Sequence, residues 1–136
     1  IHCQKNATFE KQSYLKFNLS SVSGAAITSA TLRMYLSVSS LGATVKAYSC
    51  ADDSWTETGI TWNNKPAAGT QQASCTNINA INQWYDWNLT SYIGAEFAGD
   101  KVVSVVIRDD LSQNKDTEWR SREYAGYSPQ LVVISE

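Results

Sequence analysis

Acidic side chains are the residues of this chain with the clearest capacity for chemistry. Seven of them fall in predicted loops or near predicted strand ends: Asp52, Asp53, Glu57, Asp86, Asp109, Asp110 and Glu123. Two carboxyl groups about 5–9.5 Å apart can cleave a glycosidic bond, one as acid and the other as nucleophile or base. The sequence has no spacing that forces any two of these residues together, so glycoside cleavage stays open on these residues alone.

Nucleophilic and metal chemistry lack their usual residues. The only histidine is His2, so a Ser-His-Asp or Cys-His site would rest on a poorly anchored end of the chain. One histidine and three dispersed cysteines do not form a zinc ligand set, and no phosphate loop is present. Asp109, Asp110 and Asp116 could hold calcium, but the EF-hand spacing is missing and we predict a solvated turn instead. We expect no metal and no cofactor.

Length and composition indicate a single globular domain. The 136 residues are 43% hydrophobic and 18% charged, which suffices for a buried core. The formal net charge is −2 and no basic stripe interrupts the predicted strands, so nucleic acid is not an expected partner. No run of about 18 apolar residues occurs, so membrane insertion is not expected.

Three acceptor sites for N-linked glycans indicate an exported protein. They begin at Asn6, Asn18 and Asn88. Together with a disulfide, they would be typical of a secreted, extracellular or cell-surface protein. The sequence starts at Ile1 rather than at an initiator methionine, which is typical of a processed chain or a fragment.

The stretch between Cys50 and Cys75 is the most unusual part of the chain. Trp55 and Trp62 lie seven positions apart in a Thr- and Gly-rich link, and each has a large apolar surface to cover. The alternation of Ile60 with Trp62 predicts a short half-buried strand. We therefore predict a lid over one end of the fold. Its structural residues are Trp55, Glu57, Thr61, Trp62, Asn63 and Pro66.

The cysteines at the two ends of this stretch could fasten it. A Cys50–Cys75 bridge would close a loop of roughly 25 residues, which is worth about 3 kcal/mol in the chain-entropy model. Cys3 is then left over. A spare cysteine in a secreted chain indicates an intermolecular bridge, and a buried free thiol is the alternative.

Period-two alternation of apolar and polar residues predicts strands along most of the chain. The alternation is clearest at residues 14–19 and 32–38, and the β-branched run at residues 102–107 is typical of a central strand. Thr90 or Ser91 can cap a short helix. Many short strands separated by turn signals predict an all-β antiparallel sandwich of the jelly-roll type with one short helix.

Parity along these strands turns several aromatic and cationic side chains outward. Exposed rings suit stacking against sugars, and cations suit an acidic polymer. The candidate carbohydrate contacts are Tyr35, Lys46, Tyr48, Trp84, Arg120 and Arg122. The alternative is that Tyr35 and Tyr48 form ordinary cross-strand pairs.

Residues 118–124 alternate as well, and this pattern turns Glu123 inward beside Trp119. A carboxylate in that position needs a partner such as Arg33 or Arg108. We therefore predict a structural role for the Ser121-Arg122-Glu123 sequence.

Several of these segments resemble the DNRLRE domain family. The matching segments, in family order over nearly the whole chain, are residues 14–20, 30–35, 54–66, 87–90, 121–123 and 129–133. The resemblance implies a jelly-roll module without catalytic activity that occurs on secreted and cell-surface proteins. Some members bind alginate-like acidic polysaccharides. On this ground we expect that the chain is not an enzyme.

The chain departs from the family pattern at three points. Family members usually begin with an additional strand, and nothing before Ile1 supplies it. Asn18 and Asn88 stand where Asp is common, and Gln130 replaces a usual Arg. The first departure would leave a sheet edge unpaired, and such an edge can accept a strand from another chain.

Two hypotheses for function follow. The first, which the unpaired edge and spare Cys3 favour, is a glycosylated building block of an extracellular fibre or surface layer, joined head to tail by strand sharing. The second is a carbohydrate-binding module for an acidic, alginate-like polysaccharide, attached to a secreted enzyme. The expected partners are accordingly neighbouring copies of the chain or a polysaccharide.

Overall fold

The computed structural model describes residues 1–111 and 113–136, and it confirms an antiparallel β-sandwich with one short helix. The elements are β1 (His2–Lys5), β2 (Glu10–Asn18), β3 (Ile27–Ser39), β4 (Ala43–Cys50), β5 (Gln71–Ile78), β6 (Gln83–Asn88), α1 (Thr90–Ala98), β7 (Val102–Arg108), β8 (Asp116–Trp119) and β9 (Gln130–Ser135). Each pairing between these strands is antiparallel.

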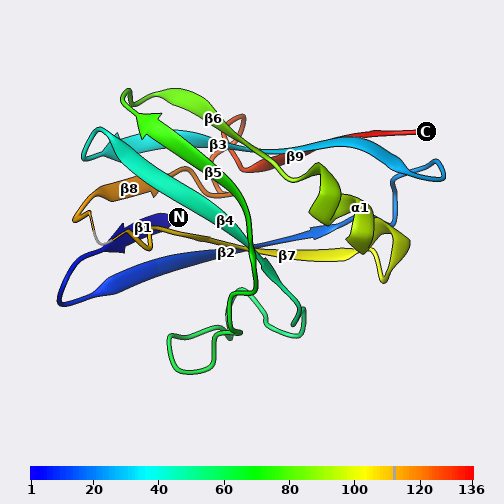
Figure 1. Cartoon of the computed structure of the whole chain (residues 1–136), viewed down its shortest axis with the longest axis horizontal. Helices are drawn as coiled ribbons and strands as arrows, with labels where there is room; N and C mark the ends of the chain where they lie inside the picture. Colours follow the sequence, from blue (N-terminus) through cyan, green and yellow to red (C-terminus); the bar gives the residue numbers. More distant parts are fainter. Residues whose placement is uncertain (112) are drawn as a thin grey trace.

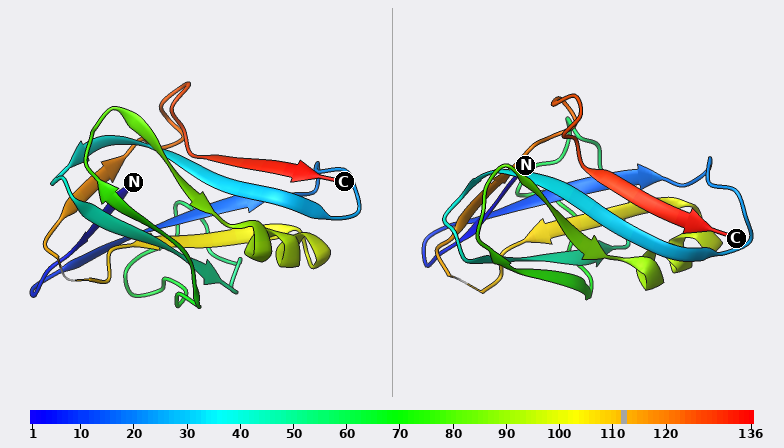
Figure 2. Two further views of the ribbon diagram at one scale, coloured as in Figure 1. Left: turned by 45° about the horizontal axis from the view of Figure 1, so that its top comes forward. Right: turned by 90° about the horizontal axis from the view of Figure 1, so that it is seen from above.

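The strands form a curled sheet whose two halves enclose the core (Figure 1). Their order is β5-β4-β7-β2-β1-β8-β3-β6, with β9 paired to β3. Strand β2 joins the halves, because Glu10 and Lys11 pair with β1 whereas Gln12–Asn18 pair with β7. Figure 2 shows α1 and the C-terminus at the same end of the sandwich.

Alternation along the central strands builds the core. On β3, the inward side chains of Leu32, Met34 and Leu36 are fully buried. On β7, residues 103–107 are all buried, as predicted for a strand covered on both faces. The alternation of residues 32–38 predicts that Val38 also points inward. It is instead 49% exposed, because the pairing of β3 with β8 shifts register between Leu36 and Val38.

Trp87 on β6 is the largest fully buried side chain. Its indole N–H donates to the backbone oxygen of Val45 at 2.9 Å, which satisfies its polar atom inside the core. Its ring meets that of Trp119 edge to face, with 5.4 Å between centroids. The bond to Val45 on β4 ties the two halves of the sheet together, whereas the ring pair packs within the half that contains β3, β6 and β8.

Helix α1 closes one end of the core with Tyr92, Ile93 and Phe97, which are buried. The hydroxyl of Tyr92 donates to the backbone oxygen of Ser104 at 2.8 Å. The prediction of a side-chain cap by Thr90 or Ser91 is wrong, because the N-cap residue is Leu89 and it makes no such bond.

Two predicted strands are turns instead. Residues 60–62 pair with no strand in the described part of the chain, and β8 ends at Trp119 rather than near residue 124. Glu123 therefore does not face inward. It is exposed, and its carboxylate lies 3.3 Å from Arg122 rather than against Arg33 or Arg108.

The predicted Cys50–Cys75 disulfide is wrong, and all three cysteines are free. Cys75 is paired across the β4–β5 ladder with Val45, five residues before Cys50 on β4. At about 3.3 Å per residue this separates the two cysteines by roughly 16 Å along the strand, far beyond the reach of a disulfide.

Cys3 is a buried free thiol, and it is not placed to form the intermolecular bridge that was the other alternative. Its side chain is fully buried, and its thiol donates to the backbone oxygen of Ile107 at 3.4 Å. Burial raises the pKa of Cys3 to about 12. The thiol is therefore protonated and unreactive at neutral pH.

One edge of β2 is open. Beyond Lys11, β2 pairs only with β7 among the strands of the described residues. Ser13 makes side-chain bonds to the backbone of His2, but Tyr14–Asn18 have no strand on their second side. No helix in the described part of the chain has the length and apolar character of a membrane span.

Buried Trp87 and exposed Trp62 should differ in how much their replacement by alanine lowers the stability of the protein. We expect Trp87→Ala to lower the free energy of unfolding by about 3–5 kcal/mol, because it leaves a large cavity in the core. We expect Trp62→Ala to cost less than about 1 kcal/mol, because Trp62 is 53% exposed and its main contact is an exposed cation–π pair. Urea denaturation measures both, and comparable losses would contradict the structure.

Candidate functional site

Hydrogen bonds from buried and half-buried side chains fasten the lid, residues 51–70, to the sandwich. The indole N–H of Trp55 donates to the hydroxyl of Ser104 at 2.9 Å, and that hydroxyl donates in turn to Asp53. The hydroxyl of Tyr14 on β2 donates to the backbone oxygen of Pro66 at 2.6 Å. Because Ser104 is fully buried in β7, the lid is anchored to the centre of the sheet.

Side-chain bonds to backbone fold the tip of the lid. The amide of Asn64 donates to the backbone oxygen of Gly59 at 2.8 Å, and its oxygen accepts from the backbone N–H of Thr61 at 2.6 Å. These bonds replace the strand pairing that the Ile60/Trp62 alternation predicted. The tip consequently turns Trp62 outward.

Trp62 is exposed, not buried in the lid as predicted. Its side chain is 53% exposed, and the ammonium of Lys65 lies 3.6 Å from the ring centroid. Thr61 and Asn63 beside it are exposed as well, whereas Pro66 is buried. The tip thus presents an aromatic ring and a cation together.

A hollow of about 680 Å³ lies between the lid, β2 and the turn of residues 120–129. Its apolar lining comes from Leu15, Phe17 and Val102, and its charged rim includes Lys16 and Arg122. A second hollow of about 290 Å³ extends to the lid tip. We call the two hollows the lid groove, because both are lined by Tyr14, Trp55 and Glu57.

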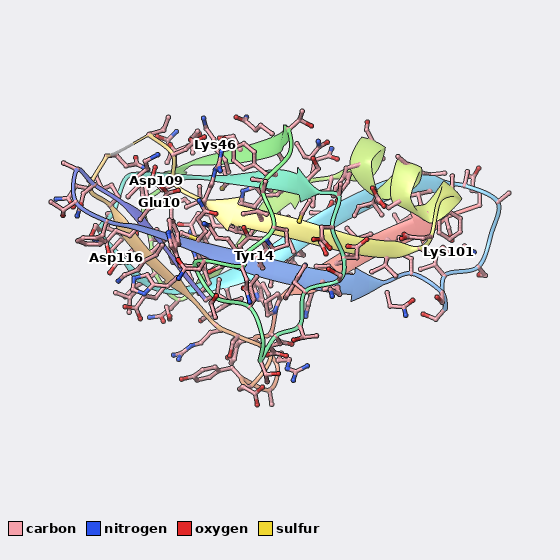
Figure 3. The ribbon with its side chains drawn as sticks, turned by 90° about the horizontal axis from the view of Figure 1, so that it is seen from below. Glu10, Tyr14, Lys46, Lys101, Asp109 and Asp116 are labelled. Atoms are coloured by element: carbon pink, nitrogen blue, oxygen red, sulfur yellow. The ribbon has the colours of Figure 1, made fainter. Side chains whose placement is uncertain are left out.

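Figure 3 shows Tyr14 on β2, and the lid and the turn projecting from the same side of the molecule. The guanidinium of Arg122 on the turn lies 2.9 Å from the carboxylate of Glu57 on the lid. Both side chains are exposed, so the pair adds little stability, but it connects the two walls of the lid groove.

Cations outnumber carboxylates along the lid groove. Lys16, Lys65 and Arg122 line it against Asp53 and Glu57. The ammonium of Lys16 lies 4.4 Å from the Trp55 ring centroid and donates to the backbone oxygen of Asp53 at 2.6 Å. These lysines sit on aromatic rings at the lining, so the groove offers rings and positive charge at the same places.

A second cluster of aromatic side chains lies on the outer face of β3 and β6. We call it the sheet-face patch, and its members are Arg33, Tyr35, Trp84, Arg120, Tyr124 and Tyr127. Tyr35 and Trp84 are direct partners in the β3–β6 ladder. Of the predicted carbohydrate contacts, Tyr35, Trp84 and Arg120 therefore gather here.

Lys46 and Tyr48 lie elsewhere, on the outer side of β4. Tyr48 is only 6% exposed, and its hydroxyl donates to Asp110, which Lys46 also approaches at 3.2 Å. Burial raises the pKa of Tyr48. Burial alone would raise the pKa of Asp110. The hydrogen bonds from Tyr48 and Lys46 to its carboxylate have the larger combined effect, so the pKa of Asp110 is lowered. These side chains contact one another and lie apart from the other candidate contacts, so a sugar contact by Lys46 and Tyr48 stays a prediction.

Within the described residues, one group of side chains could converge on a metal ion: His2, Asp116 and Glu118. His2 pairs with Asp116, and the ammonium of Lys11 lies 3.4 Å from its Nε2. This positive charge opposes a bound cation. Among the described residues, Asp109 and Asp110 do not join Asp116 in such a group.

The three glycan acceptors share a local geometry. The side-chain oxygens of Asn6, Asn18 and Asn88 each accept the backbone N–H two residues on, at 2.8, 2.8 and 3.0 Å. Asn18 and Asn88 are exposed and Asn6 is half-buried. Glycosylation at these positions stays a prediction.

Comparison with known proteins identifies the family. Residues 1–135 match carbohydrate-binding module family 96, so the chain belongs to this family. It is also 28% identical over 126 residues to a gellan lyase from a Bacillus species. The match covers 88% of this chain but only 5% of that protein. The chain is thus a carbohydrate-binding β-sandwich, as the DNRLRE resemblance implied for some members.

Sequence reasoning missed Lys16, Lys65, Tyr124 and Tyr127 as site residues. The Trp62-Asn63-Asn64-Lys65 run carried a signal for one of them, since a cation three residues after an aromatic in a tight turn can fold back onto the ring. The two tyrosines were missed because the alternation of residues 118–124 predicts a strand that continues beyond Trp119, where the structure has a turn.

The lid should depend on the hydroxyl of Ser104. We expect Ser104→Ala to lower the free energy of unfolding by about 1–3 kcal/mol, because the indole N–H of Trp55 loses its acceptor. Amide hydrogen exchange in residues 51–66 should accelerate, whereas exchange in β4 and β7 should stay slow. Ser91→Ala, at an exposed helix position, is the control. Unchanged exchange in the lid of Ser104→Ala would contradict the anchoring role.

Proposed function

We propose that this chain is a non-catalytic module that binds an acidic polysaccharide in the lid groove. The observation that carries the proposal is the exposed Trp62 ring beside Lys65, at the edge of a groove that also holds Lys16 and Arg122. The apolar face of a sugar ring can stack on the indole, and the carboxylate of an acidic sugar can pair with the cations. Family membership supports the carbohydrate class of the ligand.

The dimensions of the lid groove suit a short stretch of a polymer. Its larger hollow of about 680 Å³ falls inside the range of small-ligand sites, about 300–1,000 Å³. The lining combines Leu15 and Phe17 with charged side chains on the rim. An apolar floor with a few charged groups is typical of sites that bury one face of a ligand and orient it by polar contacts.

The carboxylates of the groove support binding rather than catalysis. Asp53 accepts a hydrogen bond from Ser104, and Glu57 is paired with Arg122 at 2.9 Å. Asp53 is thereby held in a structural contact, whereas glycoside cleavage needs an acid and a base that are both free to reach the same bond. We therefore propose that the module has no enzymatic activity of its own.

The larger context also belongs to the proposal. The chain spans about 5% of the length of the curated relative it matches, a gellan lyase. By analogy, we propose that this module is carried on a longer secreted protein that acts on an acidic polysaccharide. The family match favours this hypothesis over a fibre building block.

Affinity electrophoresis tests the proposal. The protein should be retarded in native gels that contain alginate or gellan, and added salt should weaken the retardation because the contacts are exposed and charged. Trp62→Ala and Lys65→Ala should each weaken binding by about tenfold, the equivalent of about 1.4 kcal/mol.

The matched control is Phe9→Ala, which removes a ring of similar exposure (46%) that also lies near a lysine but outside the lid groove. This variant should migrate as the unchanged protein does. Absence of retardation in both gels would refute acidic-polysaccharide binding, and equal retardation of Trp62→Ala would refute the groove as the site.

A further inference from the structure

We infer that the sheet-face patch is a second polysaccharide-contacting surface, so that one module holds two segments of acidic polymer. The inference rests on the proposed function for the class of ligand, an acidic polysaccharide. It does not rest on the lid groove, because the two surfaces lie on different strands: β2 and the lid form the groove, whereas β3 and β6 carry the patch.

The ring geometry of the patch is fixed by packing. Tyr35 and Trp84 meet edge to face, with 5.5 Å between centroids and 75° between planes. Tyr127 lies against both, 4.4 Å from Tyr35 and 6.5 Å from Trp84, and its plane is within 25° of the indole plane. Rings held in this way lose little rotamer freedom when a ligand stacks on them.

A purely structural role does not explain the whole patch. Cross-strand packing accounts for Tyr35 and Trp84, which are ladder partners. Tyr124 and Tyr127 come instead from the turn and remain 49% and 46% exposed. Exposed rings grouped over the polar side of an antiparallel sheet indicate a contact surface.

Two guanidinium groups flank the rings. Arg33 lies 5.2 Å from the Trp84 ring centroid, and Arg120 lies 4.1 Å from that of Tyr124. Arg33 is paired with Asp86 at 2.9 Å through its Nε, which leaves the other guanidinium donors for a ligand. Arg120 has no ion pair among the described residues. A planar guanidinium can bind a sugar carboxylate through two hydrogen bonds.

The turn of residues 120–129 connects the two surfaces. Ser121 and Arg122 line the lid groove, and Arg120, Tyr124 and Tyr127 belong to the patch. One short segment therefore contributes to both surfaces. Two sites on one module raise the apparent affinity for a long polymer beyond that of either site, because the second contact forms at high effective concentration.

Isothermal titration with an alginate hexasaccharide measures the number of sites directly. We expect two sites on the unchanged protein, one on Tyr127→Ala and one on Trp62→Ala. Tyr127→Phe, which keeps the ring, should retain two, and Phe9→Ala is the control outside both surfaces. In alginate gels Tyr127→Ala should weaken retardation by about tenfold, the equivalent of about 1.4 kcal/mol.

The outcomes separate this inference from the proposed function. One site on the unchanged protein, lost in Trp62→Ala and kept in Tyr127→Ala, would overturn the patch and leave the lid groove intact. One site lost in Tyr127→Ala and kept in Trp62→Ala would leave the patch and overturn the groove. No binding of the hexasaccharide and no retardation in alginate or gellan would overturn both.

Discussion

The hydroxyl of Ser104 is the contact on which the candidate site depends. It accepts the indole N–H of Trp55 and donates to Asp53, and it is fully buried in the central strand β7. A buried hydroxyl with both partners in one loop fixes the position of that loop relative to the sheet. The lid then carries Trp62 and Lys65 to the edge of the groove, where β2 and the turn of residues 120–129 supply the other walls.

The same residue type serves opposite purposes in this fold. Trp87 and Trp119 are buried and pack against each other in the core, whereas Trp62 is half exposed beside a lysine. The local backbone conformation determines whether each ring points into the core or into solvent. Strand pairing turns Trp87 into the core, and the side chain of Asn64 folds the lid tip so that Trp62 points outward.

The fold could be predicted because the strongest signals were local and periodic. The inward row of β3 as far as Leu36 and the apolar run of β7 follow directly from the sequence, and the structure confirms both. The Cys50–Cys75 pairing could not be predicted correctly, because it depends on the register of β4 against β5, which no residue near the cysteines reveals.

The candidate site was harder to predict than the fold. Alternation at residues 60–62 and 120–124 is typical of strands, but in both places side-chain bonds and turns replace pairing. This error hid the outward direction of Trp62 and the grouping of Tyr127 with Tyr35 and Trp84. The correct part of the prediction, Tyr35 with Trp84, came from strands whose parity was read correctly.

The central claim is that a sugar polymer contacts Trp62 while the core tryptophans stay untouched. Each of the five tryptophans has one indole N–H, so an NMR titration with an alginate oligosaccharide can follow them separately. The account predicts that the Trp62 signal shifts with ligand concentration and that the signals of Trp87 and Trp119 stay in place. A titration in which the ligand binds and the Trp62 signal does not move would contradict it.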